Sequence, residues 1–299
     1  MDLQTVAVMS AGDMGQGVGR AIRESGRRVI TSLAGRSDRT RGLAEKAGLE
    51  DVGTLEALIR EADIVLSIMP PAAALEFATS AAGVMTSTGS RPTYADLNAI
   101  SPATTRQIEA VIRKAGAVYI DGGIVGMAPG KAAPTRVYVC GEHAGIMDQL
   151  AGESMRIVQM GPEIGRASAM KMLYSALNKG TWALQAAVLI AAEQYGLVDE
   201  VLAELAGSQP AVEKRMRDWV GFLAADSHRW IAEMDEIAET LSDVGVTPYF
   251  HRGARDTYSL LAETPLAGET RETWDRSRPL EKSVKIFAET LRQRTKAAK

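Results

Sequence analysis

The sequence predicts an α/β protein in which a doubly wound, mostly parallel sheet precedes an all-helical C-terminal domain. In the first half of the chain, short apolar segments alternate with amphipathic segments, which is the pattern of a parallel sheet covered by helices on both faces. A glycine-rich turn follows the first apolar segment. From Arg166 to Tyr195 there is no proline and no strand-like run, and the later segments have helical periodicity. We therefore expect two domains, residues 1–164 and 165–299, joined by one long helix.

The individual elements are expected in an alternating order. Apolar runs bounded by glycine or polar residues predict strands at 5–10, 27–34, 63–71, 93–98, 117–123, 135–142 and 156–161. Helical spacing between them predicts helices at 14–26, 39–48, 54–62, 73–85 and 101–116. After the long helix, further helices are expected at 198–207, 210–225, 228–245, 254–263 and 280–294. The sequence contains no internal repeat.

Composition argues against several classes of function. Apolar residues make up 46% of the chain, charged residues make up 24%, and the net charge is −3, so we expect a soluble protein without a nucleic-acid or membrane surface. The N-terminus has no signal-peptide pattern and the longest apolar run is too short to span a bilayer, which predicts a cytoplasmic protein. The single cysteine, Cys140, is expected in the core of a protein from a reducing compartment. His143, His228 and His251 lack metal-pair spacing, so no metal is expected.

The first turn has the form of a dinucleotide-binding loop with one exception. Gly12 and Gly15 occupy the second and third glycine positions of such a loop, whereas Ser10 occupies the first. Glycines at these places allow a tight turn and a close approach of backbone to a pyrophosphate at the helix N-terminus. The loop alone also fits an ordinary strand–turn–helix. Ser10 is compatible with cofactor binding if its φ angle is negative.

The second strand discriminates between the two nicotinamide cofactors. An NAD site expects a carboxylate about 20 residues after the loop, but this chain has Gly35, followed by Arg36 and Ser37. An arginine fork and a neighbouring hydroxyl suit the 2′-phosphate of NADP. NADP is therefore expected rather than NAD, and the alternative reading is that Arg36 is an ordinary surface charge.

Several stretches together resemble the β-hydroxyacid dehydrogenase superfamily, which includes 3-hydroxyisobutyrate and 6-phosphogluconate dehydrogenases. They are SAGDMGQGVGRAI, ADIVLSIMPP, ADLNAISPATTRQIEA, IDGGIVGMAPG and GPEIGRASAMKMLYSALNKG. They occur in the family's order, and the C-terminal region is similar to a less-characterised branch with its own helical domain. Imine reductases are a sister group that as a rule lacks the lysine of the last stretch.

The resemblance implies three groups of site residues. It implies cofactor contacts from Ser10, Gly12, Asp13, Met14, Gly15, Arg36, Ser37, Met69, Pro70 and Asn98. It implies a substrate loop containing Gly123, Val125, Gly126 and Met127. It also implies that Lys171 transfers the hydroxyl proton, with Ser175 and Asn178 on the same helical face orienting the substrate.

Two departures from the family pattern bear on the substrate. Ser175 stands where the family has asparagine, and Val125 and Met127 replace a serine and a glycine of the substrate loop. Since valine cannot donate a hydrogen bond to a carboxylate, these changes favour a bulkier or less acidic alcohol or carbonyl compound.

The expected function is NADP-dependent interconversion of a hydroxyl and a carbonyl on a small organic molecule. The alternatives are an imine or enamine reductase and a catalytically silent NADP-binding sensor. A homodimer is implied by the family alone. Arg229, Glu233 and Glu236 predict either a surface ion-pair ladder or part of a substrate pocket, and we expect Trp219, Trp230 and Met234 in the core.

Overall fold

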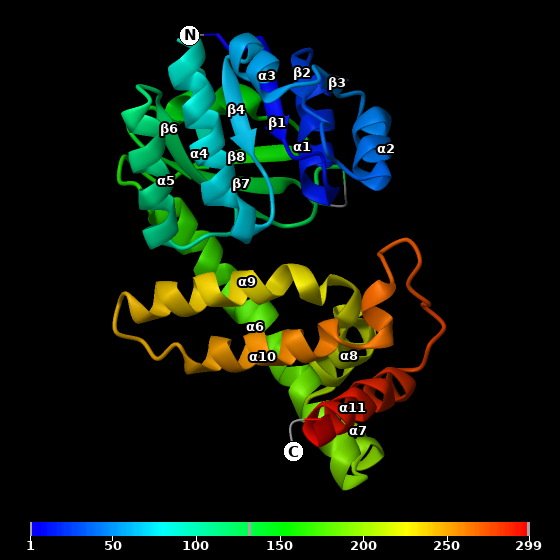
Figure 1. The fold of residues 1–299 in the computed structure, drawn as a ribbon. Helices are drawn as coiled ribbons and strands as arrows, with labels where there is room; N and C mark the ends of the chain where they lie inside the picture. The colour runs from blue at the N-terminus through cyan, green and yellow to red at the C-terminus, as the bar shows by residue number, and fades with distance from the viewer. Residues whose placement is uncertain (1, 131–132, 298–299) are drawn as a thin grey trace. The chain divides into compact units, whose positions relative to one another are not determined.

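The computed structural model describes residues 2–130 and 133–297 (Figure 1). The chain forms two compact units, Met1–Tyr174 and Ser175–Lys299. The division falls later than the expected boundary at 164/165. The reason is that the first turns of the long helix pack on the sheet and therefore belong to the first unit. A Cβ atom built on Gly123 of the sheet would lie 3.2 Å from the carbonyl oxygen of Ala167 on this helix.

The first unit contains an eight-stranded sheet of order β3-β2-β1-β4-β5-β6-β7-β8, in which only the β6–β7 pair is antiparallel. Its strands are β1 (Thr5–Met9), β2 (Arg28–Thr31), β3 (Glu50–Asp51), β4 (Ile64–Ser67), β5 (Thr93–Asp96), β6 (Tyr119–Val125), β7 (Thr135–Cys140) and β8 (Met155–Gln159). The expected mostly parallel sheet is confirmed. The two-residue β3 was not expected, because Glu50 and Asp51 are polar and exposed.

Helices cover both faces of this sheet, as Figure 1 shows. The helix α1 (Asp13–Glu24), α2 (Asp38–Ala47) and the 3₁₀ helix η1 (Ala144–Leu150) contribute to one apolar layer. The helices α3 (Leu55–Glu61), α4 (Pro71–Thr88) and α5 (Pro102–Lys114) contribute to the other. Side chains of Ser37, Thr54 and Ser101 accept backbone N–H bonds at the starts of α2, α3 and α5, which fixes where these helices begin.

Every element of the second unit is helical, as the periodicity predicts. The long helix α6 spans Arg166–Tyr195, and its residues from Ser175 onward lie in this unit. It is followed by α7 (Val198–Ser208), α8 (Pro210–Trp219), η2 (Val220–Phe222), α9 (Leu223–Ser242), α10 (Tyr249–Ala262), η3 (Pro265–Gly268) and α11 (Leu280–Ala297). Trp230 and Met234 are buried as expected, but Trp219 is 44% exposed and stacks on Trp182 at 5.7 Å between ring centroids.

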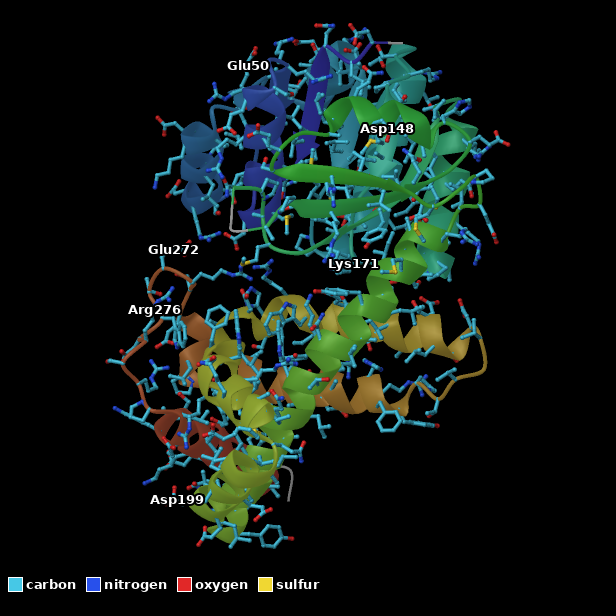
Figure 2. The ribbon with its side chains drawn as sticks, turned by 180° about the vertical axis from the view of Figure 1, so that it is seen from behind. Glu50, Asp148, Lys171, Asp199, Glu272 and Arg276 are labelled. Carbon is cyan, nitrogen blue, oxygen red and sulfur yellow. The ribbon has the colours of Figure 1, made fainter. Side chains whose placement is uncertain are left out.

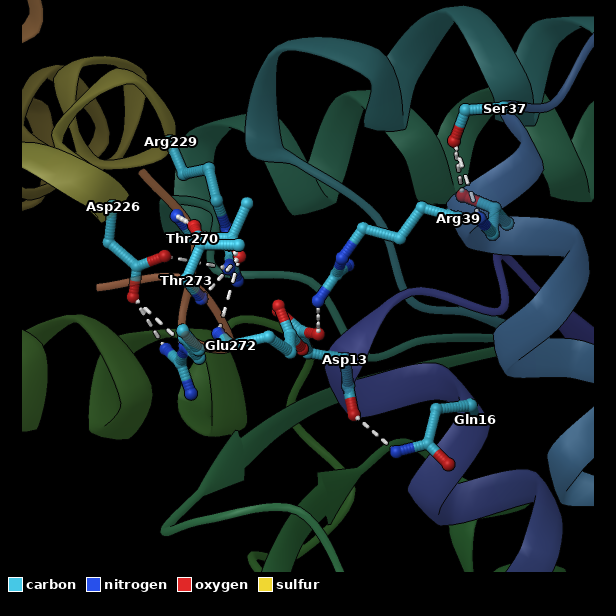
Figure 3. A network of polar contacts seen from close by, with 11 residues as sticks. Asp13, Gln16, Ser37, Arg39, Asp226, Arg229, Thr270, Glu272 and Thr273 are labelled. Atoms are coloured by element: carbon cyan, nitrogen blue, oxygen red, sulfur yellow. Dashed lines mark hydrogen bonds and ion pairs between the residues drawn. The ribbon is translucent and has the colours of Figure 1, made fainter. Parts of the chain in front are cut away.

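Of the two expectations for α9, the surface ion-pair ladder is wrong for Glu233, and a place in a substrate pocket stays a prediction. The Glu233 side chain is only 5% exposed and is ion-paired with Lys179 of α6, because this side of α9 faces α6 rather than solvent. The Nζ atom of Lys179 also lies 5.5 Å from the ring centroid of Trp230. Arg229 is paired instead with Asp226, whose other carboxylate oxygen accepts from Arg271 (Figure 3). In the described part of the chain, no helix is long and apolar enough to cross a membrane, and no three or more His, Cys, Asp or Glu side chains are grouped so that they could hold a metal ion.

Glycines bring α1 close to its neighbours. A Cβ atom on Gly15 would lie 1.9 Å from the carbonyl oxygen of Ser10, at the end of β1. A Cβ atom on Gly19 would lie 2.5 Å from a methyl group of Leu49, and one on Gly17 would lie 2.9 Å from Cβ of Ala128. These glycines therefore let α1 pack closely against β1, Leu49 and Ala128.

This geometry makes opposite predictions for two Gly→Ala substitutions. Gly15→Ala should lower the free energy of unfolding by about 1–3 kcal/mol, because the added methyl group overlaps a backbone atom that cannot move alone. The matched control is Gly83→Ala on the exposed side of α4, where a Cβ atom meets nothing within 4 Å. That substitution should raise the free energy of unfolding by about 0.5–1 kcal/mol. Urea denaturation of the full chain measures both, and equal effects would contradict the packing described for α1.

Candidate functional site

The loop after β1 has the features of an anion site. The helix α1 begins at Asp13, and its N-cap, Gly12, has extended backbone angles and no side chain to cap the helix. A Cβ atom on Gly12 would meet nothing within 4 Å, so there is open space beside the N-cap of this helix. The N–H groups of a helix start without a side-chain cap carry a partial positive charge, which fits the pyrophosphate of a dinucleotide.

Ser10, at the first position of this loop, does not have a positive φ angle. No residue other than glycine in the described part of the chain has a positive φ angle. The Ser10 N–H donates to the carbonyl oxygen of Ile68 at 3.0 Å, which joins the loop after β1 to the loop after β4. The condition for Ser10 to fit a cofactor loop is met. Met14 is half-buried against the apolar layer beneath α1.

The turn after β2 explains why no carboxylate stands at position 35. Gly35 has φ = +68°, a left-handed conformation that glycine adopts without a Cβ penalty. Arg36 follows it and is half-buried, and its guanidinium makes no polar contact within the described residues. Ser37 caps α2 by accepting from the N–H of Thr40 at 3.3 Å. The Arg36 side chain is thus available to an anion, whereas the Ser37 hydroxyl also has a structural role.

An ion pair that was not expected joins this turn to the glycine loop. Figure 3 shows the Arg39 side chain directed at Asp13, with Nη2 at 2.6 Å from the carboxylate oxygen Oδ1. Asp13 is the first residue of α1. Arg39 therefore offsets a negative charge at a helix start that is otherwise suited to anions.

Asn98 has a structural role at the ends of β4 and β5. It is 2% exposed, its Oδ1 accepts from the N–H of Met69 at 2.6 Å, and its Nδ2 donates to Ser67 at 2.8 Å and to Asp96 at 3.1 Å. These bonds hold Met69 and the following Pro70 in place at the start of α4. A direct contact between Asn98 and a cofactor stays a prediction.

The residues expected in the substrate loop lie in different environments. Gly123 and Val125 are buried in β6, and Val125 is only 1% exposed. Gly126 has φ = +110°, and Met127 after it is 58% exposed. A substrate could therefore meet Met127 and the backbone of Gly126 but not the Val125 side chain. The loop continues to Pro129, whose carbonyl oxygen accepts from Arg20 of α1 at 3.0 Å.

Lys171 stands near the start of α6, as Figure 2 shows. It is half-buried, and a Cβ atom on Gly123 would lie 2.6 Å from its Cβ atom. Gly123 lies toward the carboxyl end of β6, which is parallel to β5. The carboxyl ends of β1, β4 and β5 carry the loops described above, and open α/β sheets bind their ligands at this edge.

A buried carboxylate that the sequence analysis missed holds this helix start. Asp121 of β6 is 0% exposed and accepts from the N–H of Gly165 at 2.8 Å, from the N–H of Ser168 at 3.3 Å and from the thiol of Cys140 at 2.9 Å. Burial, together with the nearby Asp121 charge, raises the pKa of the Cys140 thiol to about 12. Cys140 is therefore a neutral hydrogen-bond donor in the core, as expected from its sequence context.

Ser175 and Asn178 follow Lys171 by one and two turns on α6. Their spacing places all three on one helical face. Ser175 is 3% exposed and Asn178 is half-buried, and both belong to the second unit. Their roles in a site stay predictions.

Two family profiles match the chain. Residues 5–151 match the NAD-binding domain of 6-phosphogluconate dehydrogenase, and residues 192–261 match a domain of unknown function, DUF1932. An uncharacterised 28.5 kDa protein of Methanothermus fervidus is 29% identical over 174 residues, which are 58% of this chain and 65% of that protein. The match thus spans less than two thirds of the curated relative.

Solved structures share the fold over most of the chain. A conserved protein of unknown function, described as structurally similar to 3-hydroxyacid dehydrogenases, is 29% identical with a TM-score of 0.61, and 86% of this chain and 98% of that one are covered. The 3-hydroxyisobutyrate dehydrogenase from Salmonella typhimurium is 18% identical with a TM-score of 0.65, and 94% of this chain and 99% of that one are covered. An imine reductase from Myxococcus stipitatus in complex with NADP⁺ is 19% identical with a TM-score of 0.53, and 88% of this chain and 94% of that one are covered.

The matched domains agree with the fold and with the helix start that fits a dinucleotide pyrophosphate. The NAD-binding match covers the glycine loop, Arg36, Asn98 and the β6 strand, and the DUF1932 match lies within the helical unit. This chain belongs to the β-hydroxyacid dehydrogenase superfamily, in a branch that joins a 6-phosphogluconate dehydrogenase-type NAD-binding domain to a DUF1932 domain.

Proposed function

We propose that this protein is an NADP-dependent oxidoreductase that interconverts a hydroxyl and a carbonyl on a small organic molecule. The observation that carries the proposal is the place of Lys171, packed against Gly123 at the carboxyl edge of the sheet that carries the dinucleotide loop. An amine at this edge can exchange a proton with a substrate oxygen. The membership of the chain in a dehydrogenase superfamily supports the same reaction class.

In the proposed oxidation, the neutral amine of Lys171 accepts the proton of the substrate hydroxyl. NADP⁺ held at the start of α1 would supply the hydride acceptor for the carbon that bears this hydroxyl, which would leave a carbonyl. In reduction, the ammonium of Lys171 returns the proton to the carbonyl oxygen as it becomes a hydroxyl. Ser175 and Asn178 orient the substrate, and the amides of the first turn of α1 hold the pyrophosphate.

The substrate is proposed to be bulkier or less acidic than a short hydroxy acid. Val125 is buried in β6 and supplies no group to a substrate, and the exposed Met127 presents a flexible apolar side chain rather than a donor to a carboxylate. The related fold of imine reductases keeps imine reduction as the second candidate reaction. A silent NADP-binding sensor is the third.

Replacing Lys171 distinguishes among these three candidate functions. A panel of hydroxy acids, larger alcohols, aldehydes, ketones and cyclic imines is incubated with NADP⁺ or NADPH, and nicotinamide absorbance is followed. Lys171→Ala and Lys171→Arg should each lower kcat on an alcohol–carbonyl pair by about 10²–10⁴-fold with cofactor affinity unchanged, because neither can exchange the proton at neutral pH. Lys285→Ala, on the exposed side of α11, is the matched control and should have no effect.

Unchanged imine reduction in Lys171→Ala would instead support imine reductase activity. If the unmodified protein binds NADPH but converts no compound of the panel, the sensor function is favoured.

Arg36 is proposed to bind the 2′-phosphate of NADP. Its guanidinium makes no polar contact within the described residues, and the left-handed Gly35 before it leaves no carboxylate for the ribose hydroxyls of NAD. Ser37 is proposed to add a hydrogen bond from its hydroxyl while it caps α2.

The protein is also proposed to be cytoplasmic. The buried free thiol of Cys140 accords with a reducing environment.

Fluorescence titration with NADPH and NADH tests the cofactor preference. Arg36→Ala should raise the Kd for NADPH by about 10- to 100-fold, since a charge-assisted bond to phosphate is lost, and leave the Kd for NADH unchanged. Arg28→Ala, at the opposite end of β2 and paired with Glu50 and Glu61, is the matched control. Equal affinity of the unmodified protein for the two cofactors would rule out the proposed preference.

The protein is also proposed to form a homodimer through α6. Leu177, Leu184, Val188 and Tyr195 are 75%, 64%, 40% and 81% exposed, and they recur at intervals of seven, four and seven residues. This spacing places them on one stripe of the helix, as in helices that pack against a second helix.

Light scattering during size-exclusion chromatography tests the dimer. The unmodified protein should have twice the chain mass of 31.9 kDa, and Leu184→Glu should reduce it to one chain mass, because a carboxylate in an apolar helix seam is costly. Val244→Glu introduces the same charge at a residue that is 74% exposed after α9, and it should leave the mass unchanged. An unmodified protein of one chain mass would end the dimer proposal.

A further inference from the structure

We propose that Asp121 is a positioning residue for Lys171, because it caps α6 from the neighbouring strand and so sets where the lysine stands. The proposal rests on the proposed function, in which Lys171 exchanges the proton. Asp121 does not touch the substrate in this proposal. It acts through the first turn of the helix.

The start of α6 lacks a cap of its own. The residue before the helix is Gly165, which has φ = +102° and no side chain that could accept a hydrogen bond. The N–H groups of Gly165 and Ser168 instead donate to one carboxylate oxygen of Asp121, at 2.8 and 3.3 Å. The N–H of Ala167 is directed at the sulfur of Cys140 at 3.4 Å. The helix start is therefore held by residues of β6 and β7 that lie more than 20 positions earlier in the sequence.

The carboxylate is fully buried and its two oxygens are both used. Oδ2 accepts from the two amides and from the Cys140 thiol, and Oδ1 accepts from the hydroxyls of Ser168 at 2.5 Å and Thr105 at 3.3 Å. A buried negative charge is stabilised here by the positive end of the α6 dipole and by these donors. An asparagine of the same shape would turn an NH₂ group toward donors and break this arrangement.

A second contact of the same strand, between Gly123 and Lys171, links the position of Lys171 to that of Asp121. Asp121 and Gly123 are two residues apart in β6, so both face the same side of the sheet. Gly123 allows the backbone of α6 to approach, and its missing Cβ would lie 2.6 Å from Cβ of Lys171. Lys171 follows Ser168 by three residues, which is less than one turn. With the first turn fixed at Asp121, the helix can neither rotate nor slide at Lys171, and a slip of one residue would turn the lysine by about 100°.

The test combines amide exchange with a double-mutant cycle. In Asp121→Asn, backbone amides of residues 165–171 should exchange with deuterium about tenfold faster or more, because the cap is lost. On the compound that turns over fastest in the panel above, kcat should fall about 10- to 100-fold with little change in the Kd for NADPH. Ser168→Ala removes one donor, leaves the carboxylate in place, and should give a smaller change in the same direction.

The decisive readout is whether the effect of Asp121→Asn on the rate requires Lys171. In a Lys171→Ala background, Asp121→Asn should lower the residual rate no further, because no lysine remains to be positioned. The matched control is Asp63→Asn, whose carboxylate accepts from the N–H groups of Gln4 and Thr5, both at 2.8 Å, at the opposite end of the sheet. It should leave kcat unchanged.

Three results would overturn the proposal. They are unchanged amide exchange in Asp121→Asn, an unchanged kcat in Asp121→Asn, and an equal loss of rate from Asp121→Asn with and without Lys171. Failure of the proposed function is recognised separately, because then Lys171→Ala by itself would leave the rate unchanged. If Asp121→Asn does not fold, Ser168→Ala provides the same exchange and rate comparisons.

Discussion

The site in the first unit depends on one buried carboxylate, that of Asp121, and on the helix start that it holds. The long helix α6 is preceded by a glycine, whose missing side chain cannot cap it. Asp121 and the sulfur of Cys140 accept from N–H groups at the start of the helix, so its first turn is fixed to β6 and β7. The hydroxyl of Thr105 on α5 donates to Asp121. This constraint also explains why the first compact unit extends to Tyr174, well into the helix.

Close backbone approach is the second requirement, and glycines meet it. Gly15 lets α1 begin directly against the end of β1, which leaves the helix start open to an anion. Gly123 does the same for α6 and brings Lys171 to the sheet. The two helix starts thus serve opposite purposes. The start of α1 has no side-chain cap and suits a phosphate, whereas the start of α6 is satisfied internally, which suits the role proposed for Lys171.

The sequence predicts the elements well because their signals are local. The apolar runs of β1, β4 and β6 and the proline-free stretch of α6 are visible without any partner. The same holds for the glycine loop and for Arg36. In contrast, the Asp121 cap joins residues 44 and 47 positions apart, and the Arg39–Asp13 pair joins residues 26 positions apart. A buried-looking aspartate in the run YIDGG and an uncapped helix start at GPEIGRA were the available signals. Glu233 was misjudged because helical spacing does not say which face of α9 meets α6.

The most direct measurement is a crystal structure of the protein with NADP⁺ bound. We expect the pyrophosphate at the start of α1 beside Gly12, the 2′-phosphate in contact with Arg36 and Ser37, and the Asp121 contacts to Gly165 and Ser168 retained. We also expect the amine of Lys171 on the same side of the sheet as the nicotinamide ring. A dinucleotide bound away from α1, or a Lys171 side chain directed away from the nicotinamide, would rule out the proposed cofactor site or the proposed role of Lys171.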